Sequence, residues 1–205
     1  MSKIAAIVLA AGSSRRFGDA NKLLAEIAGR PLIAHSVSAF VASRATDIVV
    51  VTGPDQLAIQ SALHGLPVWF THNPDHLSGM GGSIATGLAA IPPDCDGVLI
   101  CPGDMPGVTS QFIDTLIDAF AASGADRIIR ATLPDGRPAH PVLWPARHFP
   151  ALKQLSGPEG GRDLLKTLAA DIVTLNSTDG DTALDIDTQR DLEILRERLR
   201  NQHSS

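Results

Sequence analysis

A loop rich in glycine, serine and arginine follows the first apolar run of the chain. It reads Leu9-Ala10-Ala11-Gly12-Ser13-Ser14-Arg15-Arg16-Phe17-Gly18, and Lys22 lies four positions further on. Glycine lets backbone N–H groups approach an anion, and the side chains of Arg16 and Lys22 would add charge-assisted hydrogen bonds. The spacing fits neither the Walker A pattern nor GxGxxG. We predict that residues 9–14, Arg16 and Lys22 bind a triphosphate. The alternative is an ordinary turn with two exposed arginines.

A carboxylate follows another apolar run, Gly97-Val98-Leu99-Ile100-Cys101, in the segment Gly103-Asp104-Met105-Pro106. Phosphoryl transfer involves large negative charge, and Mg²⁺ in such sites takes one or two carboxylates together with phosphates and water. Asp104 is therefore the predicted Mg²⁺ ligand. Its alternative role, capping the next helix, is disfavoured because Thr109 or Ser110 is better placed for that cap.

Short β-rich runs alternate with helical stretches, and these elements must position the loop and Asp104. The expected strands are 4–11, 47–52, 67–71, 97–101, 127–133 and 172–175, and the expected helices are 31–43, 56–63, 83–91, 112–120, 161–169 and 188–201. This alternation predicts a single-domain three-layer α/β/α fold with a mostly parallel, Rossmann-like nucleotide-binding sheet. The Pro/Gly-rich stretch from Pro134 to Pro145 interrupts the pattern and is expected to be irregular. Ligands of such sheets bind at the carboxyl ends of the strands.

Composition narrows the class of protein. The 205 residues carry a formal charge of −5 and are 44% apolar, which is typical of one globular domain over 1–205. An acidic chain is not expected to bind nucleic acid or an anionic membrane, since both attract basic surfaces. Cys95 and Cys101 fit neither a redox pair nor a zinc site and are expected to be buried. No segment has the features of a signal peptide or a membrane helix, so we expect a cytoplasmic protein.

The first loop and its following lysine resemble the signature of the MobA-like nucleotidyltransferases, and most closely that of the molybdenum cofactor cytidylyltransferases. The likeness runs along nearly the whole chain. In order, it includes Asn73-Pro74, Gly79-Met80, Gly103-Asp104-Met105-Pro106, Ala139-His140-Pro141-Val142-Leu143, Gly160-Gly161-Arg162 and Asp185-Ile186-Asp187-Thr188. Each later motif is weak alone, but their order and separation together make a strong signal.

The resemblance implies which residues act on the phosphates. Arg16, Lys22 and Asp104 would be catalytic. Asp187 would be a second Mg²⁺ ligand beside Asp104, unless it only caps the last helix. Asp185 is less suited because alternation in an extended segment points it to the opposite face.

The resemblance also implies contacts with the two substrates. Further nucleotide contacts are expected at Asn73, Gly79, Ser83 and Gly103. The acceptor is expected in the part 134–187, at His140 and Pro141, where the imidazole could hydrogen-bond the acceptor phosphate or a pterin edge.

The implied activity is transfer of CMP from CTP to the phosphate of molybdopterin, with Mg²⁺ as cofactor and release of pyrophosphate. The pair Ala10-Ala11, where guanylyl-transferring relatives tend to carry a second glycine, favours CTP within the resemblance. The implied partners are CTP, or another NTP, the molybdenum cofactor and a molybdenum hydroxylase client. Two alternatives stay open. One is a related nucleotidyltransferase with another NTP or acceptor, such as guanylyl transfer to the same cofactor or use of a sugar or polyol phosphate. The other is a non-catalytic protein that delivers the cofactor.

Overall fold

The computed structural model describes residues 2–12, 21–133, 135–177, 188, 190–194 and 196. Most of the first loop, with Ser13, Ser14 and Arg16, therefore lies outside the described residues. Asp185 and Asp187 lie outside them as well.

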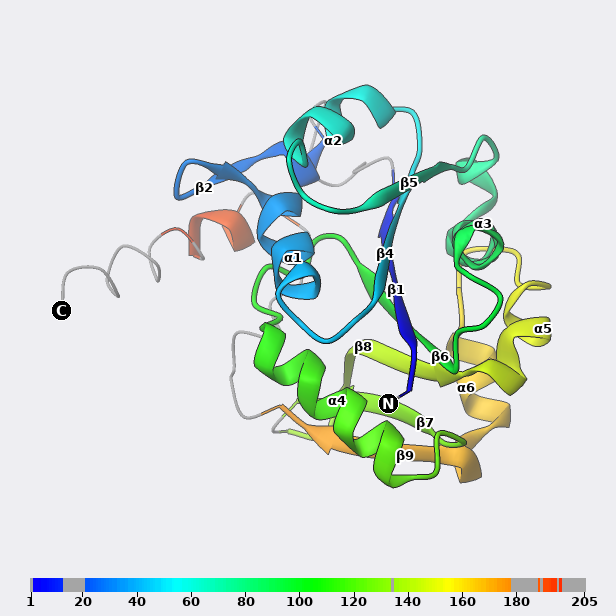
Figure 1. The fold of residues 1–205 in the computed structure, drawn as a ribbon. Coiled ribbons are helices and arrows are strands. Elements are labelled where there is room, and N and C mark those ends of the chain that lie inside the picture. The colour runs from blue at the N-terminus through cyan, green and yellow to red at the C-terminus, as the bar shows by residue number, and fades with distance from the viewer. Residues whose placement is uncertain are drawn as a thin grey trace, which may run out of the picture.

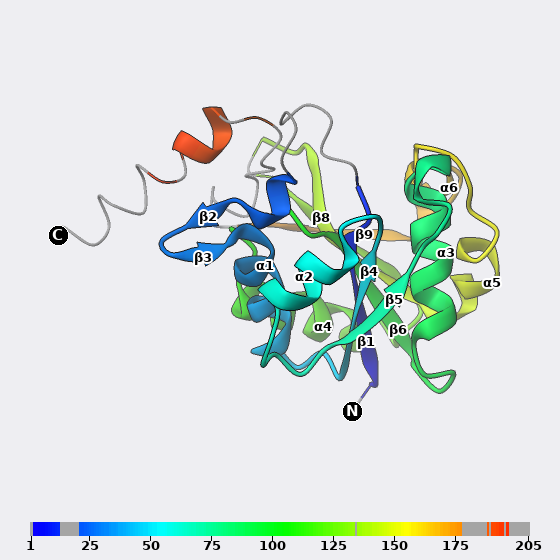
Figure 2. The same ribbon diagram turned by 90° about the horizontal axis from the view of Figure 1, so that it is seen from above.

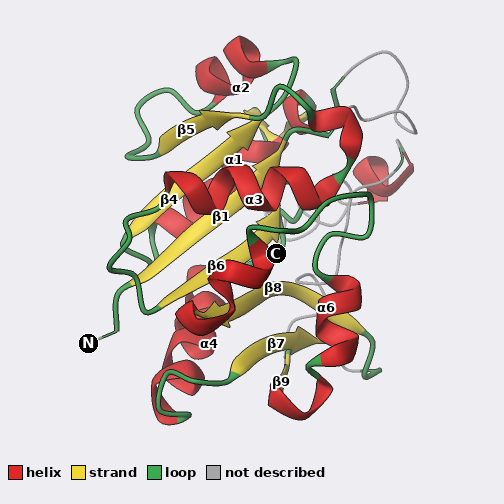
Figure 3. Ribbon diagram, turned by 90° about the vertical axis from the view of Figure 1, so that its right-hand side faces the viewer, coloured by secondary structure: helices red, strands yellow, loops and turns green. Residues whose placement is uncertain are grey.

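Strands in the described residues form a seven-stranded central sheet and a small hairpin. They are β1 (Ile4–Ala10), β2 (Glu26–Ile27), β3 (Arg30–Pro31), β4 (Asp47–Thr52), β5 (Trp69–His72), β6 (Gly97–Pro102), β7 (Ile128–Thr132), β8 (Pro138–Pro145) and β9 (Ile172–Asn176). The central order is β5-β4-β1-β6-β8-β7-β9 (Figure 3). Every neighbouring pair is parallel except the two that β8 makes, with β6 and with β7. The predicted, mostly parallel sheet is confirmed.

Helices cover both faces of this sheet. They are α1 (Leu32–Val41), α2 (Gln56–Ala62), α3 (Met80–Ala90), α4 (Ser110–Ala122), α5 (Phe149–Leu152) and α6 (Arg162–Thr167). Apolar side chains of α1, α2 and α4 share one buried cluster with the sheet, and those of α3, α5 and α6 pack into a second cluster on the other face (Figures 1 and 2). Strands covered on both faces read as continuous apolar runs, as β1, β4 and β6 do. The three-layer α/β/α architecture is therefore confirmed.

The expectation of an irregular stretch from Pro134 to Pro145 is wrong. β8 runs through it, antiparallel between β6 and β7, with Val142 and Trp144 buried in the sheet. A proline cannot donate to a ladder, so it is tolerated at strand ends and irregularities. Pro138 and Pro145 stand at the two ends of β8. Pro141 lies in the part where the β7–β8 register shifts, so a continuous ladder does not depend on its missing N–H.

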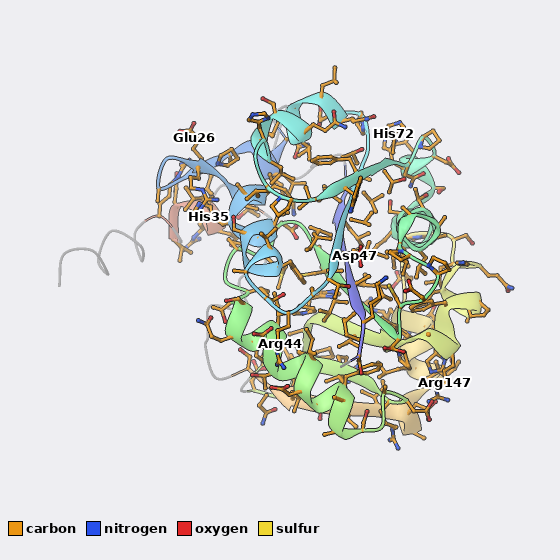
Figure 4. All side chains as sticks on the ribbon, in the orientation of Figure 1. Glu26, His35, Arg44, Asp47, His72 and Arg147 are labelled. Atoms are coloured by element: carbon orange, nitrogen blue, oxygen red, sulfur yellow. The ribbon has the colours of Figure 1, made fainter. Side chains whose placement is uncertain are left out.

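The hairpin of β2 and β3 was not predicted, and it links distant parts of the chain. From the C-terminal segment, the guanidinium of Arg196 donates to the carbonyl oxygen of Glu26 (2.6 and 3.0 Å), and Leu192 is buried in the core. From α1, the ring of His35 contacts the carbonyl oxygen of Ile27 at 2.8 Å. Figure 4 shows Glu26 and His35 on the same side of the molecule.

Two expectations from composition can be compared with the structure. Cys95 and Cys101 are both buried thiols, as predicted. No helix in the described part of the chain is long and apolar enough to span a bilayer.

His148 is expected to make the stability depend on pH. Its imidazole lies edge-on to Trp144, with ring centroids 6.1 Å apart, and is almost fully buried. Burial lowers the pKa of His148 below its ordinary 6.5, and Arg147 adds to this, whereas Asp171 and Asp126 oppose it. The unfolded chain therefore takes up this proton at a higher pH than the folded protein does. The contribution of His148 to the free energy of unfolding therefore falls as the pH drops below about 6.5.

Urea unfolding of wild type and His148→Phe at pH 7.5 and pH 5 measures this contribution. We expect the loss of stability between the two pH values to be smaller in the variant, which has no proton to take up at this position. His64→Phe, a change at an exposed histidine, should leave the wild-type loss unaltered. An equal loss in His148→Phe and wild type would contradict the assignment.

Candidate functional site

The carboxyl ends of β1 and β6 meet where the order of the strands reverses. From β1 the chain runs outward to β4 and β5 and then returns to β6 on the other side of β1, and ligands of open sheets bind at such a point. The N–H of Gly103 donates to the carbonyl oxygen of Leu9 (2.9 Å). A Cβ at Gly53 would lie only 2.6 Å from the carbonyl oxygen of Ala11. Leu9 and Ala11, at the start of the predicted phosphate loop, thus lie against the loops that follow β6 and β4.

Lys22 and Asp104 form an ion pair at this edge of the sheet, with their side chains only 15% and 11% exposed. Lys22 begins a short 3-10 helix, Lys22–Leu24, and Asn21 caps it by accepting a hydrogen bond from the N–H of Leu23 (3.0 Å). The cap fixes where this turn begins, and so the point from which the lysine side chain leaves the backbone. The structure therefore brings together two of the three residues predicted to be catalytic, while Arg16 lies outside the described part.

The other carboxylate oxygen of Asp104, Oδ1, is not the atom that pairs with Lys22. Oδ1 is buried and has no hydrogen-bond partner among the described residues, although buried polar atoms are as a rule hydrogen-bonded. The alternative capping role does not apply, because Oγ1 of Thr109 accepts from the N–H of Phe112 (3.2 Å) and caps α4. An orphaned carboxylate oxygen is the kind of ligand that Mg²⁺ takes. Asp104 therefore fits a divalent cation.

A cation at Asp104 would need further ligands. The described residues contain no group of three or more His, Cys, Asp or Glu side chains that could hold a metal ion. Asp187, the predicted second ligand, lies outside them. Phosphate oxygens and water commonly complete Mg²⁺ sites that have few protein ligands.

His140 reaches the same edge because β8 is antiparallel to β6. Val142 pairs with Ile100, so His140 and Pro141, which precede Val142 in β8, lie beside the carboxyl end of β6. Burial lowers the pKa of His140 from 6.5, while the carboxylate of Asp104 and the carbonyl of Ile100 oppose this. The buried Nδ1 of His140 has no hydrogen-bond partner in the described structure.

Asn73 and Ser83 are joined to each other. The side-chain amide of Asn73 donates to Oγ of Ser83 (3.0 Å), and its oxygen accepts from the N–H of Asp75 (3.0 Å). Gly79, at a φ of 115°, packs so closely on Gly157 that a Cβ would clash with the backbone there. These contacts fix the start of α3 near the carboxyl ends of β4 and β5. Contact of these residues with a nucleotide stays a prediction.

A cavity of about 980 Å³ opens beside His140. It lies between α3, the loop 156–161, α6 and the strands β6, β8, β7 and β9. Its walls are largely apolar, and they also carry four cationic side chains. The apolar wall includes Met80, Ile84, Trp144, Leu152 and Leu165, and the cations are Arg130, Arg137, Arg162 and Lys166.

Arg130, whose side chain lines this cavity, was not among the residues predicted from the sequence. The available signal was its position two residues after Ile128 in a β-rich run, where alternation predicts that both side chains share a face. Ile128 is fully buried, so a charge stands on an inward face of the sheet.

Comparison with known proteins places the chain among nucleotide-using transferases. A model of the MobA-like NTP transferase domain matches residues 6–172. The purine catabolism protein PucB of Bacillus subtilis is 29% identical over 204 residues, which cover 93% of this chain and 94% of that protein. The 2-C-methyl-D-erythritol 4-phosphate cytidylyltransferase of Streptomyces avermitilis is 33% identical over 201 residues, with 87% and 77% covered. The chain spans 27% of the bifunctional protein GlmU of Agrobacterium fabrum, at 35% identity.

Solved structures share the fold. Rv0371c from Mycobacterium tuberculosis superposes with a TM-score of 0.81 at 25% identity, covering 96% of this chain and 98% of the other. A complex of Rv0371c with manganese has a TM-score of 0.73 at 22% identity, with 96% and 99% covered.

Proposed function

Because the chain belongs to the MobA-like NTP transferase family, we propose that it transfers CMP from CTP to the phosphate of molybdopterin and releases pyrophosphate. The observation that carries this proposal is the ion pair of Lys22 and Asp104 at the carboxyl ends of β1 and β6. A cation for the triphosphate and a carboxylate for a metal ion are the groups that phosphoryl transfer needs. The cavity beside His140 supports the acceptor half of the proposal, because it offers a large molecule room next to that pair.

In the proposed reaction, an oxygen of the acceptor phosphate attacks the α-phosphorus of CTP. A new P–O bond forms while the bond to the departing pyrophosphate breaks. The attacking phosphate is already ionised at neutral pH, so no strong general base is required. Lys22 and Arg16 neutralise charge on the triphosphate, and the imidazole of His140 hydrogen-bonds the acceptor. Catalysis then rests on positioning and electrostatics.

Asp104 is the proposed protein ligand of a Mg²⁺ ion, with Asp187 as a second. When bound, such an ion neutralises charge on phosphate oxygens and orients the triphosphate. The orphaned Oδ1 of Asp104 supports this assignment, as does the manganese complex of the similar Rv0371c.

A second candidate is cytidylyl transfer to a polyol phosphate. It is favoured by the 33% identity to a 2-C-methyl-D-erythritol 4-phosphate cytidylyltransferase. Incubating the protein with each NTP, Mg²⁺ and either purified molybdenum cofactor or methylerythritol phosphate, followed by mass spectrometry, separates the two. We expect cytidylylated molybdopterin and pyrophosphate. A product formed only with the polyol phosphate would replace our proposal with the second candidate.

We predict that CTP is used in preference to GTP, by about tenfold or more. Ala11 carries a methyl group where a glycine would leave room for a purine, and a methyl-sized difference decides about 1–3 kcal/mol. Hydrogen bonds to the cytosine edge, from the first loop and from residues 79–83, must supply the rest of the preference for CTP. Competition kinetics with equimolar CTP and GTP measures the preference, and Ala11→Gly should narrow it. Equal use of both nucleotides by the wild type would overturn the cytidylyl assignment and leave the nucleotidyltransferase family intact.

A further inference from the structure

Arg130 stands in a row of otherwise uncharged side chains that crosses the sheet. The register pairs Ile7 with Ile100, Ile100 with Val142, Val142 with Arg130, and Arg130 with Thr174. Residues directly opposite each other on neighbouring strands point to the same face. Ile7, Ile100 and Val142 are buried, whereas Arg130 is half-buried and Thr174 is exposed. The guanidinium is thus placed on the cavity side of the sheet, at the floor of the cavity.

The other cations of the cavity wall are already paired. Arg137 pairs with Asp135 (2.7 Å), Arg162 with Glu159 (3.0 Å) and Lys166 with Asp163 (2.8 Å). All three are about 70% exposed at the cavity rim. Each of these cations is neutralised by its own carboxylate and screened by water, so it attracts an anionic ligand only weakly.

Arg130 differs in both respects. Its side chain is half-buried, its Nε is buried without a hydrogen-bond partner, and no ion pair of Arg130 is found in the described part of the chain. The guanidinium group of arginine stays charged in folded proteins. A charge held in a largely apolar site without a partner is costly, whereas an aliphatic side chain would continue the row at no such cost. A ligand that brings the missing acceptors would account for the arginine.

We propose that Arg130 binds an anionic group of the acceptor, remote from the phosphate that reacts. This inference rests on the proposed function. The acceptor class is then a molecule whose body packs in the space lined by Met80, Ile84 and Leu165 and whose second anionic group meets Arg130. Arginine suits this role because its planar fork matches two oxygens of a carboxylate or phosphate.

The spacing of the strands separates the two anions. Arg130 lies on β7, two strands from β6, and neighbouring strands are about 4.8 Å apart, so the two backbones are about 10 Å apart. The reacting phosphate must lie near Asp104, at the end of β6. The proposal therefore assigns the anion at Arg130 to a second group of the acceptor, apart from the reacting phosphate.

Binding of a simple apolar anion tests this site without turnover. We would titrate 2-naphthoate and its uncharged counterpart 2-naphthamide into wild type, Arg130→Met and Arg137→Met by calorimetry. We expect wild type to prefer the carboxylate. Arg130→Met should bind the carboxylate about tenfold to a hundredfold more weakly and the amide unchanged, as expected for loss of hydrogen bonds to a charged group. Arg137→Met, which removes a paired and exposed arginine from the same cavity, should behave as wild type.

Thermal unfolding shows whether the variants are folded, and Arg130→Gln, which also removes the charge, takes the place of Arg130→Met if that protein does not fold. Wild type that does not bind 2-naphthoate, or that binds it no better than the charge-free variant does, would overturn the proposed anion site.

The transfer assay with CTP and molybdenum cofactor adds a second measurement. We expect Arg130→Met to raise the KM for the acceptor about tenfold or more and to leave the KM for CTP unchanged. If wild type shows no transfer, the proposed function fails while the naphthoate titration still decides the anion site. If wild type transfers CMP and Arg130→Met does so with unchanged KM values, the inference alone fails.

Discussion

Asp104→Asn is expected to abolish metal-dependent turnover, with a loss of about 10³-fold or more in kcat. Asparagine keeps the shape of the side chain and removes the charge that would hold the cation. The buried Oδ1 has no other partner in the described structure, but Oδ2 pairs with Lys22, so thermal unfolding must show that the variant keeps its fold. Activity measured against Mg²⁺ concentration checks this. Asp187→Ala should lower kcat by no more than Asp104→Asn does.

The amino ends of the same two strands offer a matched control. Lys3 and Asp94 form an ion pair there (2.7 Å), just before β1 and β6 begin, and so mirror the pair of Lys22 and Asp104 at the opposite edge of the sheet. Asp94→Asn should leave kcat and its dependence on Mg²⁺ unchanged. If Asp104→Asn also retains both, Asp104 is not the metal ligand.

Lys22→Met is expected to lower kcat/KM by about 10²-fold or more. Methionine keeps most of the length of the side chain but cannot donate to a phosphate. Steady-state kinetics over a range of CTP concentrations measures the loss, with Lys3→Met as the corresponding control at the far edge.

If the first loop binds the triphosphate, Arg16→Ala should lower kcat/KM by a similar factor. The neighbouring Arg15 offers a direct comparison. Arg15→Ala, which removes an equal charge one position earlier, should have a much smaller effect. Wild-type kcat/KM in both Lys22→Met and Arg16→Ala would show that the triphosphate does not lie in this loop.

The α/β class and the start of the site could be predicted from the sequence because their signals are local. A buried parallel strand is a continuous apolar run, and the runs at β1, β4 and β6 each end at glycine or proline. Thr109 was recognisable as a helix cap from its position before an amphipathic helix, which left Asp104 without a capping role. The glycines and cations after β1 likewise indicated an anion site before any contact was known.

β8 was missed because its prolines conceal the strand from a local pattern. A proline disfavours a strand only where the ladder needs its N–H, and that depends on the register with β6 and β7. The direction of β8 in turn decides that His140 comes back to the edge where Asp104 lies, which the order of residues alone could not give.

The pairing of Lys22 with Asp104, and the position of Arg130, were decided only by the tertiary structure. Lys22 and Asp104 meet because β1 and β6 are neighbours at the reversal of strand order. Along the chain, the strands β4 and β5 of the same sheet lie between β1 and β6. In the sequence alone, nothing distinguishes Arg130 from the other charged residues. It becomes informative only when the register places it beside the buried Val142 and the acids around the cavity are found paired with other cations. Residue types and local periodicity determine which chemistry this chain can support, whereas strand order and register determine which of those groups meet.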